Sequence, residues 1–82
     1  KDVETRLLNW LVKHGRDAKG GGIKLSGTKR GLAAELGTSS ETLSRTLARL
    51  RDQKLISVHG KAIAVHQPQE LAAMLRRNLG EG

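Results

Sequence analysis

The chain contains no cysteine, no phenylalanine and no tyrosine, and it has one tryptophan and one proline among its 82 residues. The lack of cysteine excludes a disulfide framework, a cysteine-ligated zinc site and a thiol nucleophile. No apolar run approaches the roughly 18 residues that a membrane span needs, and no signal peptide is visible. These absences fit a cytoplasmic protein with no membrane partner.

Acidic residues are also scarce, with 8 Asp and Glu against 15 Lys and Arg, for a formal charge of +7. Such an excess on a small domain favours a polyanionic partner, either nucleic acid or an anionic membrane surface. A merely solvated basic surface would have the same composition. No paired carboxylates, activated nucleophile or pair of metal ligands at helical spacing is apparent, so the sequence predicts neither an enzyme nor a metal site.

Residues 2 to 14 are predicted to form a helix, because Val3, Leu7, Trp10 and Leu11 recur at helical spacing. Trp10 is expected to anchor the core. His14 is not expected to bind a metal, because no second ligand lies near it in the sequence. Residues 15 to 22 are predicted to form a glycine-rich loop, followed by a short strand over 23 to 25 and a turn at 26 and 27.

The stretch from Thr28 to Asp52 predicts two helices joined by a glycine turn. Thr28 is a suitable N-cap for the first helix, and Gly37 can adopt the left-handed conformation that ends it. Three residues then offer N-cap oxygens for a second helix at about residues 39 to 53: Thr38, Ser39 and Ser40. A two-helix unit with a tight turn is the helix-turn-helix of DNA-binding proteins, whose second helix lies in the major groove.

The second helix is predicted to be two-sided, with Leu43, Leu47 and Leu50 on its inner face. Its opposite face would carry Glu41, Ser44, Arg45 and Ala48. Arginine can donate two hydrogen bonds to guanine and glutamate can accept one from the cytosine amino group. This face is therefore suited to contact base edges.

Two strands are expected at about residues 55 to 58 and 62 to 65, joined at His59-Gly60-Lys61. A hairpin directly after the second motif helix would be the wing of a winged helix. His59 and Lys61 at its tip could reach phosphate, or they could be ordinary solvated turn residues. Pro68 suits the start of a last helix, which Gly80 would end. The expected fold is α+β and mostly helical: a three-helix core with a β-hairpin wing and a C-terminal helix.

Three segments together resemble the C-terminal domain of the CRP/FNR family of bacterial transcription regulators. They are Thr-Lys-Arg-Gly-Leu-Ala-Ala-Glu-Leu-Gly, Ser-Glu-Thr-Leu-Ser-Arg-Thr-Leu-Ala-Arg-Leu and Leu-Ile-Ser-Val-His-Gly-Lys. Members of this family typically carry a sensor domain and a dimerisation helix before the winged helix. The resemblance implies that residues 1–82 are the DNA-binding domain, a fragment of a protein that binds double-stranded DNA as a homodimer. It implies no cofactor in this domain and leaves the effector of the missing sensor domain unknown.

The resemblance also implies roles for particular residues. Glu41 and Arg45 would contact bases, with Ser44 before Arg45 as in the FNR branch. The CRP branch has an arginine before the glutamate, where this chain has Ser40, which could itself contact a phosphate or base. These matches favour a TTGAT half-site over TGTGA. The implied phosphate contacts are Thr28, Lys29, Ser39, Thr42, His59 and Lys61.

Two further expectations concern protein partners. In some members of the family the loop before the motif contacts RNA polymerase, and residues 15 to 22 are the matching loop. The alternative to DNA binding is a winged helix that binds another protein. The polar and basic residues Glu41, Ser44 and Arg45 favour DNA, because a protein-binding helix would more often expose apolar residues there.

Overall fold

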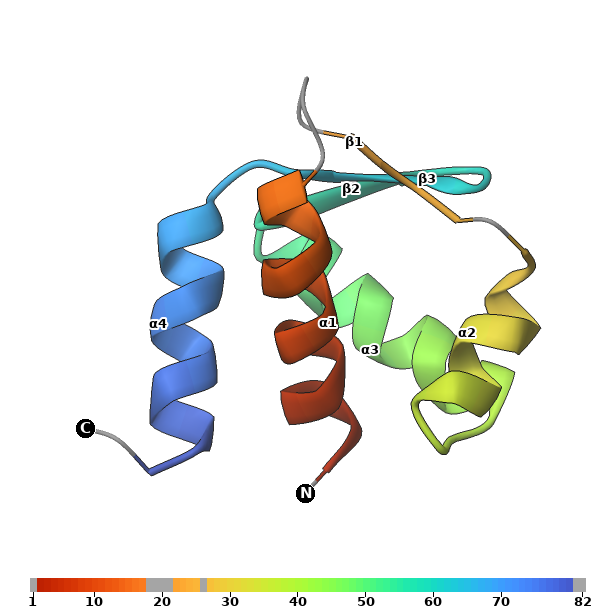
Figure 1. Ribbon diagram of the computed structural model, residues 1–82, viewed down its shortest axis with the longest axis horizontal. Helices are drawn as coiled ribbons and strands as arrows, with labels where there is room; N and C mark the ends of the chain where they lie inside the picture. Colours follow the sequence, from red (N-terminus) through yellow and green to blue (C-terminus); the bar gives the residue numbers. More distant parts are fainter. Residues whose placement is uncertain (1, 18–21, 26, 81–82) are drawn as a thin grey trace.

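The computed structural model describes residues 2–17, 22–25 and 27–80, which form four α-helices and one three-stranded antiparallel sheet (Figure 1). In chain order the elements are α1 (Val3–Asp17), β1 (Gly22–Lys24), α2 (Lys29–Glu35), α3 (Ser40–Asp52), β2 (Ile56–His59), β3 (Ala62–Val65) and α4 (Pro68–Asn78). The strand order is β1-β3-β2. This confirms the expected α+β, mostly helical winged helix-turn-helix.

Helix α1 is longer than the sequence predicts. It begins after Asp2, whose carboxylate Oδ1 accepts a hydrogen bond from the Thr5 backbone N–H at 2.8 Å. It continues through residues 15–17, which were expected to be loop. Gly15 lies against the sheet there, since a Cβ at this position would be 3.9 Å from Val65. The rest of the predicted loop up to Gly22 and the turn at residue 26 lie outside the described residues, while Gly22 itself begins β1.

The core is made of aliphatic side chains from all four helices and all three strands. Its largest fully buried members are Leu7, Leu8, Leu11, Leu43, Leu50, Ile56, Ile63 and Leu71. The inner face predicted for α3 is confirmed, because Leu43, Leu47 and Leu50 are all buried. Trp10 is half-buried against this core and stacks on His14, with ring centroids 4.3 Å apart. Burial of these side chains is the main stabilising contribution to the fold.

The hairpin β2–β3 forms the wing; β2 lies one residue later than the predicted 55 to 58, whereas β3 has the predicted bounds. His59 pairs with Ala62 and is the last residue of β2, so the loop consists of Gly60 and Lys61 alone. Gly60 has φ +59°, at the first loop position where a two-residue hairpin turn can require glycine. Strand β1 adds to the free side of β3, with Ile23 opposite Ile63.

Helix α4 runs antiparallel to α1 on the side of the molecule away from α2 (Figure 1). Pro68 occupies its first turn as predicted, and Gly80, with φ +80°, follows its C-terminal end. Leu71 is buried, whereas Met74 and Leu75 are half-buried against the core. Helix α1 packs against α4 and also contacts α3 and β1.

Candidate nucleic-acid interface

The turn between α2 and α3 is closed by two backbone hydrogen bonds, one of them from Gly37 N–H to Ala34 C=O at 3.0 Å. Gly37 has φ +76°, and Thr38 N–H donates to Ala33 C=O at 2.8 Å, the pattern of a Schellman C-cap. Arg6 from α1 adds a side-chain bond, since its Nη1 donates to the Leu36 carbonyl at 3.1 Å. The relative orientation of α2 and α3 is thus held both within the turn and from α1.

Both motif helices begin at hydroxyl N-caps, as the sequence predicts. Thr28 Oγ1 accepts from Gly31 N–H at 3.1 Å, and Ser39 Oγ accepts from Thr42 N–H at 3.2 Å. Ser39 Oγ also lies 3.0 Å from Thr42 Oγ1, to which it donates. The hydroxyl protons of Thr28 and Thr42 are not used in these bonds, so each can donate to an anion. Two helix N-termini with such donors favour phosphate.

The outer face of α3 is polar and exposed. Glu41, Ser44 and Arg45 are exposed on the side opposite the buried leucines, and Ser40 is exposed at the first position of the helix. Glu41 Oε1 and Arg45 Nη2 form an ion pair at 3.1 Å, with side-chain exposures of 72% and 75%. Two of the side chains that the resemblance assigns to base contacts, Glu41 and Arg45, are therefore adjacent and paired with each other.

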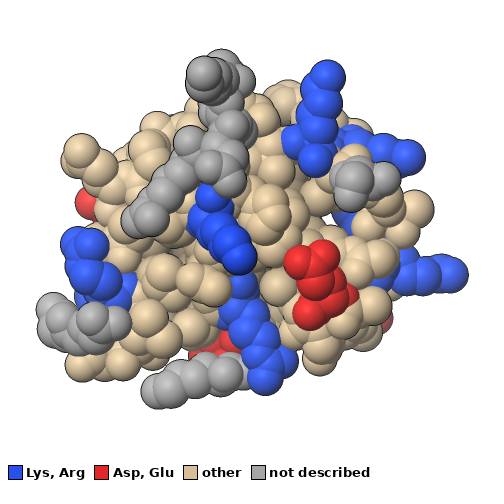
Figure 2. Space-filling model, in the orientation of Figure 1, with Lys and Arg blue, Asp and Glu red and all other residues tan. Residues whose placement is uncertain are grey.

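The wing tip lies beside the chain that leads into α2. Leu25 N–H donates to the Lys61 carbonyl at 2.8 Å, and Leu25 precedes the Thr28 cap by three residues. His59 and Lys61 are exposed, while Lys29 is half-buried at the start of α2. Figure 2 shows several Lys and Arg side chains on the side of the molecule where Figure 1 places the hairpin tip and α2. The implied phosphate contacts thus come from the start of α2, the start of α3 and the wing.

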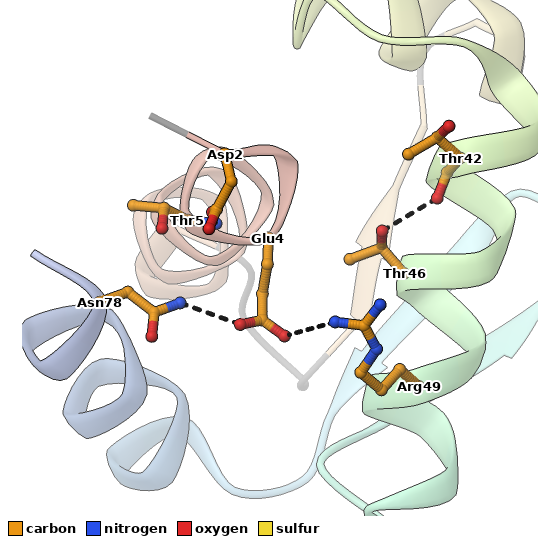
Figure 3. Close-up of polar contacts among 7 residues, drawn as sticks. All are labelled: Asp2, Glu4, Thr5, Thr42, Thr46, Arg49 and Asn78. Atoms are coloured by element: carbon orange, nitrogen blue, oxygen red, sulfur yellow. Dashed lines mark hydrogen bonds and ion pairs between the residues drawn. The ribbon is translucent and has the colours of Figure 1, made fainter.

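One polar junction was not predicted from the sequence. Glu4 Oε1 lies 3.2 Å from Arg49 Nη1, and Asn78 Nδ2 donates to Glu4 Oε2 at 3.0 Å (Figure 3). Arg49 and Asn78 lie 45 and 74 positions after Glu4 in the sequence, and no short-range pattern links them to it. The junction ties the start of α1 to the second half of α3 and to the end of α4.

The described residues give little support for a metal site, a membrane-spanning helix or a catalytic pocket. They contain no group of three His, Cys, Asp or Glu that could hold a metal ion, and none of their helices is long and apolar enough to cross a membrane. A cavity of about 310 Å³ between α1, the sheet and α4 is lined mainly by aliphatic side chains such as Leu11, Ile23 and Leu71. That lining lacks the converging polar groups of a catalytic site.

Comparison with known proteins agrees with this geometry. Residues 5–74 match the family model of the Crp-like helix-turn-helix domain. The global nitrogen regulator of Nostoc sp. is 35% identical over 77 residues, covering 88% of this chain and 34% of that protein. The cAMP-activated global transcriptional regulator CRP of Salmonella typhimurium is 42% identical over 64 residues, covering 78% of this chain and 30% of that protein. The chain thus spans about a third of the length of these relatives.

Solved structures show the same fold. FixK2 from Bradyrhizobium japonicum superposes with a TM-score of 0.81 at 28% identity, covering 89% of this chain and 38% of that one. A CooA mutant from Carboxydothermus hydrogenoformans gives a TM-score of 0.82 at 23% identity, covering 92% and 37% of the two chains. The helices, wing and C-terminal helix described above are therefore a known arrangement.

Proposed function

This chain belongs to the family of Crp-like helix-turn-helix domains, and we propose that α3 enters the major groove of double-stranded DNA, where Glu41, Ser44 and Arg45 contact base edges. The family match establishes a DNA-binding domain of the CRP/FNR type of transcription regulator and not an enzyme. The observation that carries the finer proposal is the two-sided α3. Its leucines are buried and its Glu-Ser-Arg face is exposed.

The ion pair on this face is compatible with base contact. Glu41 and Arg45 are both mostly exposed, so opening their pair costs only about 0.3–0.5 kcal/mol. A bidentate contact from Arg45 to guanine would contribute about 1–3 kcal/mol of discrimination. Exchanging the Glu41–Arg45 ion pair for an Arg45–guanine contact is therefore favourable. The exchange also leaves Glu41 free to accept a hydrogen bond from a cytosine amino group.

The proposed half-site is TTGAT. Ser44 directly before Arg45 matches the FNR branch, and Ser40 stands where the CRP branch has an arginine. Ser40 is exposed at the first position of α3, where its hydroxyl could contact a base or a phosphate. A TGTGA half-site would lack its usual arginine partner at this position.

The proposed phosphate contacts flank this helix. Thr28 and Ser39 are the N-caps of α2 and α3, and Thr42 lies in the first turn of α3 with a hydroxyl proton available to donate. Lys29, His59 and Lys61 would add positive charge at the start of α2 and at the wing. Such contacts position a protein on the duplex, whereas the base contacts give sequence preference.

The full-length protein is proposed to bind a two-fold operator as a homodimer, because paired half-sites require paired recognition helices. The segment proposed to contact RNA polymerase is residues 15 to 22, of which 18–21 lie outside the described residues. Any effector would bind outside this domain, for which we propose no cofactor, and the site of action would be the cytoplasm.

Fluorescence anisotropy tests the proposal with duplexes that carry TTGAT, TGTGA or scrambled half-sites. We expect the 82-residue chain to prefer TTGAT, with weak affinity for a single half-site. Equal, salt-sensitive binding to all three duplexes would contradict base contact by α3. Binding to none of them would favour the protein-interaction alternative.

A further inference from the structure

The junction at Glu4 differs from an ordinary surface ion pair. The Glu4 side chain is 23% exposed, whereas that of its partner Arg49 is 58% exposed. Both carboxylate oxygens are used, one by Arg49 and the other by Asn78 (Figure 3). Glu4 also lies in the first turn of α1, where the helix dipole favours a negative charge. The carboxylate is therefore held in place, and it pairs with the more exposed guanidinium of Arg49.

Arg49 lies on a flank of α3 that is also relevant to DNA. It follows Thr42 by seven residues, or two helical turns, which separates them by about 10 Å along the axis. Figure 3 shows Thr42, Thr46 and Arg49 on the side of α3 that faces α1; Thr46 is buried there, whereas Thr42 and Arg49 at either end are exposed. Since Thr42 is a proposed phosphate contact, a DNA strand that passes the exposed Thr42 end would come within reach of the long Arg49 side chain.

An arginine at that place would add affinity without sequence preference. Contacts to phosphate raise binding to every sequence and make it more sensitive to salt. In this structure, the Arg49 guanidinium is instead paired with Glu4 of α1, at 3.2 Å. The chain is already strongly basic, at +7, and one more phosphate contact would strengthen binding to nonspecific DNA as much as binding to an operator.

We propose that Glu4 is a positioning residue that holds Arg49 off the DNA backbone and thereby limits sequence-independent binding by one phosphate contact. This inference rests on the proposed entry of α3 into the major groove. It assigns Glu4 a part in the binding equilibrium in addition to its structural link between three helices. A purely structural role would change stability without adding a phosphate contact.

The test is the salt dependence of binding to a scrambled duplex, measured by fluorescence anisotropy for E4Q, R49Q and E4Q/R49Q. Glutamine keeps the size of Glu4 but removes the charge that holds Arg49. The matched control is E70Q, which removes the same charge from an exposed position in the first turn of α4, at the end opposite Asn78. Thermal unfolding followed by circular dichroism checks that each variant is folded at the assay temperature.

We expect E4Q to bind scrambled DNA more tightly at low salt, with a log K against log salt slope steeper by about 0.9. Its advantage over the unaltered chain should then shrink about threefold between roughly 50 and 200 mM salt. R49Q, E4Q/R49Q and E70Q should keep the original slope.

Three results would overturn the inference: an unchanged slope for E4Q, a steeper slope that persists in E4Q/R49Q, or a shallower slope for R49Q alone. Failure of the unaltered chain to bind any duplex at low salt would instead overturn the proposed function, and this inference with it. Equal affinity of the unaltered chain for half-site and scrambled duplexes would contradict only the base contacts, and the slopes would still decide the role of Glu4.

Discussion

Replacing Arg45 by alanine removes the side chain proposed to donate two hydrogen bonds to a guanine. A bidentate contact of this kind contributes about 1–3 kcal/mol of discrimination. From this must be subtracted the Glu41–Arg45 pair, which is lost in the complex and, with exposures of 72% and 75%, contributes only about 0.3–0.5 kcal/mol. The net loss is about 0.5–2.7 kcal/mol, or roughly 2- to 90-fold in affinity for the preferred half-site.

The assay is competition anisotropy with a set of duplexes in which each base pair of the half-site is changed in turn. Arg45→Ala should lose the preference at one position and keep the preferences at the others. The control is Arg76→Ala, which removes an exposed arginine near the end of α4 and should leave the whole preference profile unchanged. An Arg45→Ala variant that kept every preference would refute the base contact assigned to this residue.

Three other substitutions test separate parts of the structure. Lys61→Ala at the wing tip should weaken binding to all duplexes alike and reduce the salt slope by about 0.9, and a change in base preference would contradict a phosphate role. Gly37→Ala should destabilise the chain by about 1–2 kcal/mol in urea unfolding, because φ is +76° and the new Cβ would lie 3.2 Å from Arg6 Nη1. Lys54→Gly should stabilise it by about 0.5–1 kcal/mol in the same assay, because Lys54 has φ +62°. A loss of stability there would show that the lysine side chain contributes more than its backbone conformation costs.

The helix-turn-helix could be predicted because its determinants are local. The caps at Thr28 and Ser39 and the turn at Gly37 act within four residues of where they stand in the sequence. The inner face of α3 follows from helical periodicity alone. The Glu41–Arg45 ion pair could also have been predicted from the sequence, since oppositely charged residues at i,i+4 spacing commonly pair on a helix.

Other features depend on tertiary packing and were missed or misplaced. The extension of α1 through Gly15 depends on its contact with the sheet, and a glycine-rich sequence locally favours a loop. His59 was assigned to the turn, but pairing with Ala62 places it in β2. The contact of Glu4 with Arg49 joins positions far apart in the chain, and only the folded structure brings them together.

The DNA-contacting residues remain predictions at the level of individual contacts. The structure places Glu41, Ser44 and Arg45 together on an exposed face, and it places the wing tip beside the segment that leads into α2. Which bases and phosphates they contact depends on the bound complex. Sequence spacing can predict a face of a helix, but it cannot predict how deeply that helix enters a groove.

The most direct measurement of the interface is a titration of the ¹⁵N-labelled chain with a TTGAT duplex, in which the change in each amide chemical shift is measured. We predict that the large shifts fall on residues 39–45, on Thr28 and Lys29, and on His59 to Lys61, while residues 72–78 of α4 stay unchanged. The same titration with a scrambled duplex should give smaller shifts on α3. Shifts confined to α1 and α4, or equal shifts with both duplexes, would contradict recognition of DNA bases by α3.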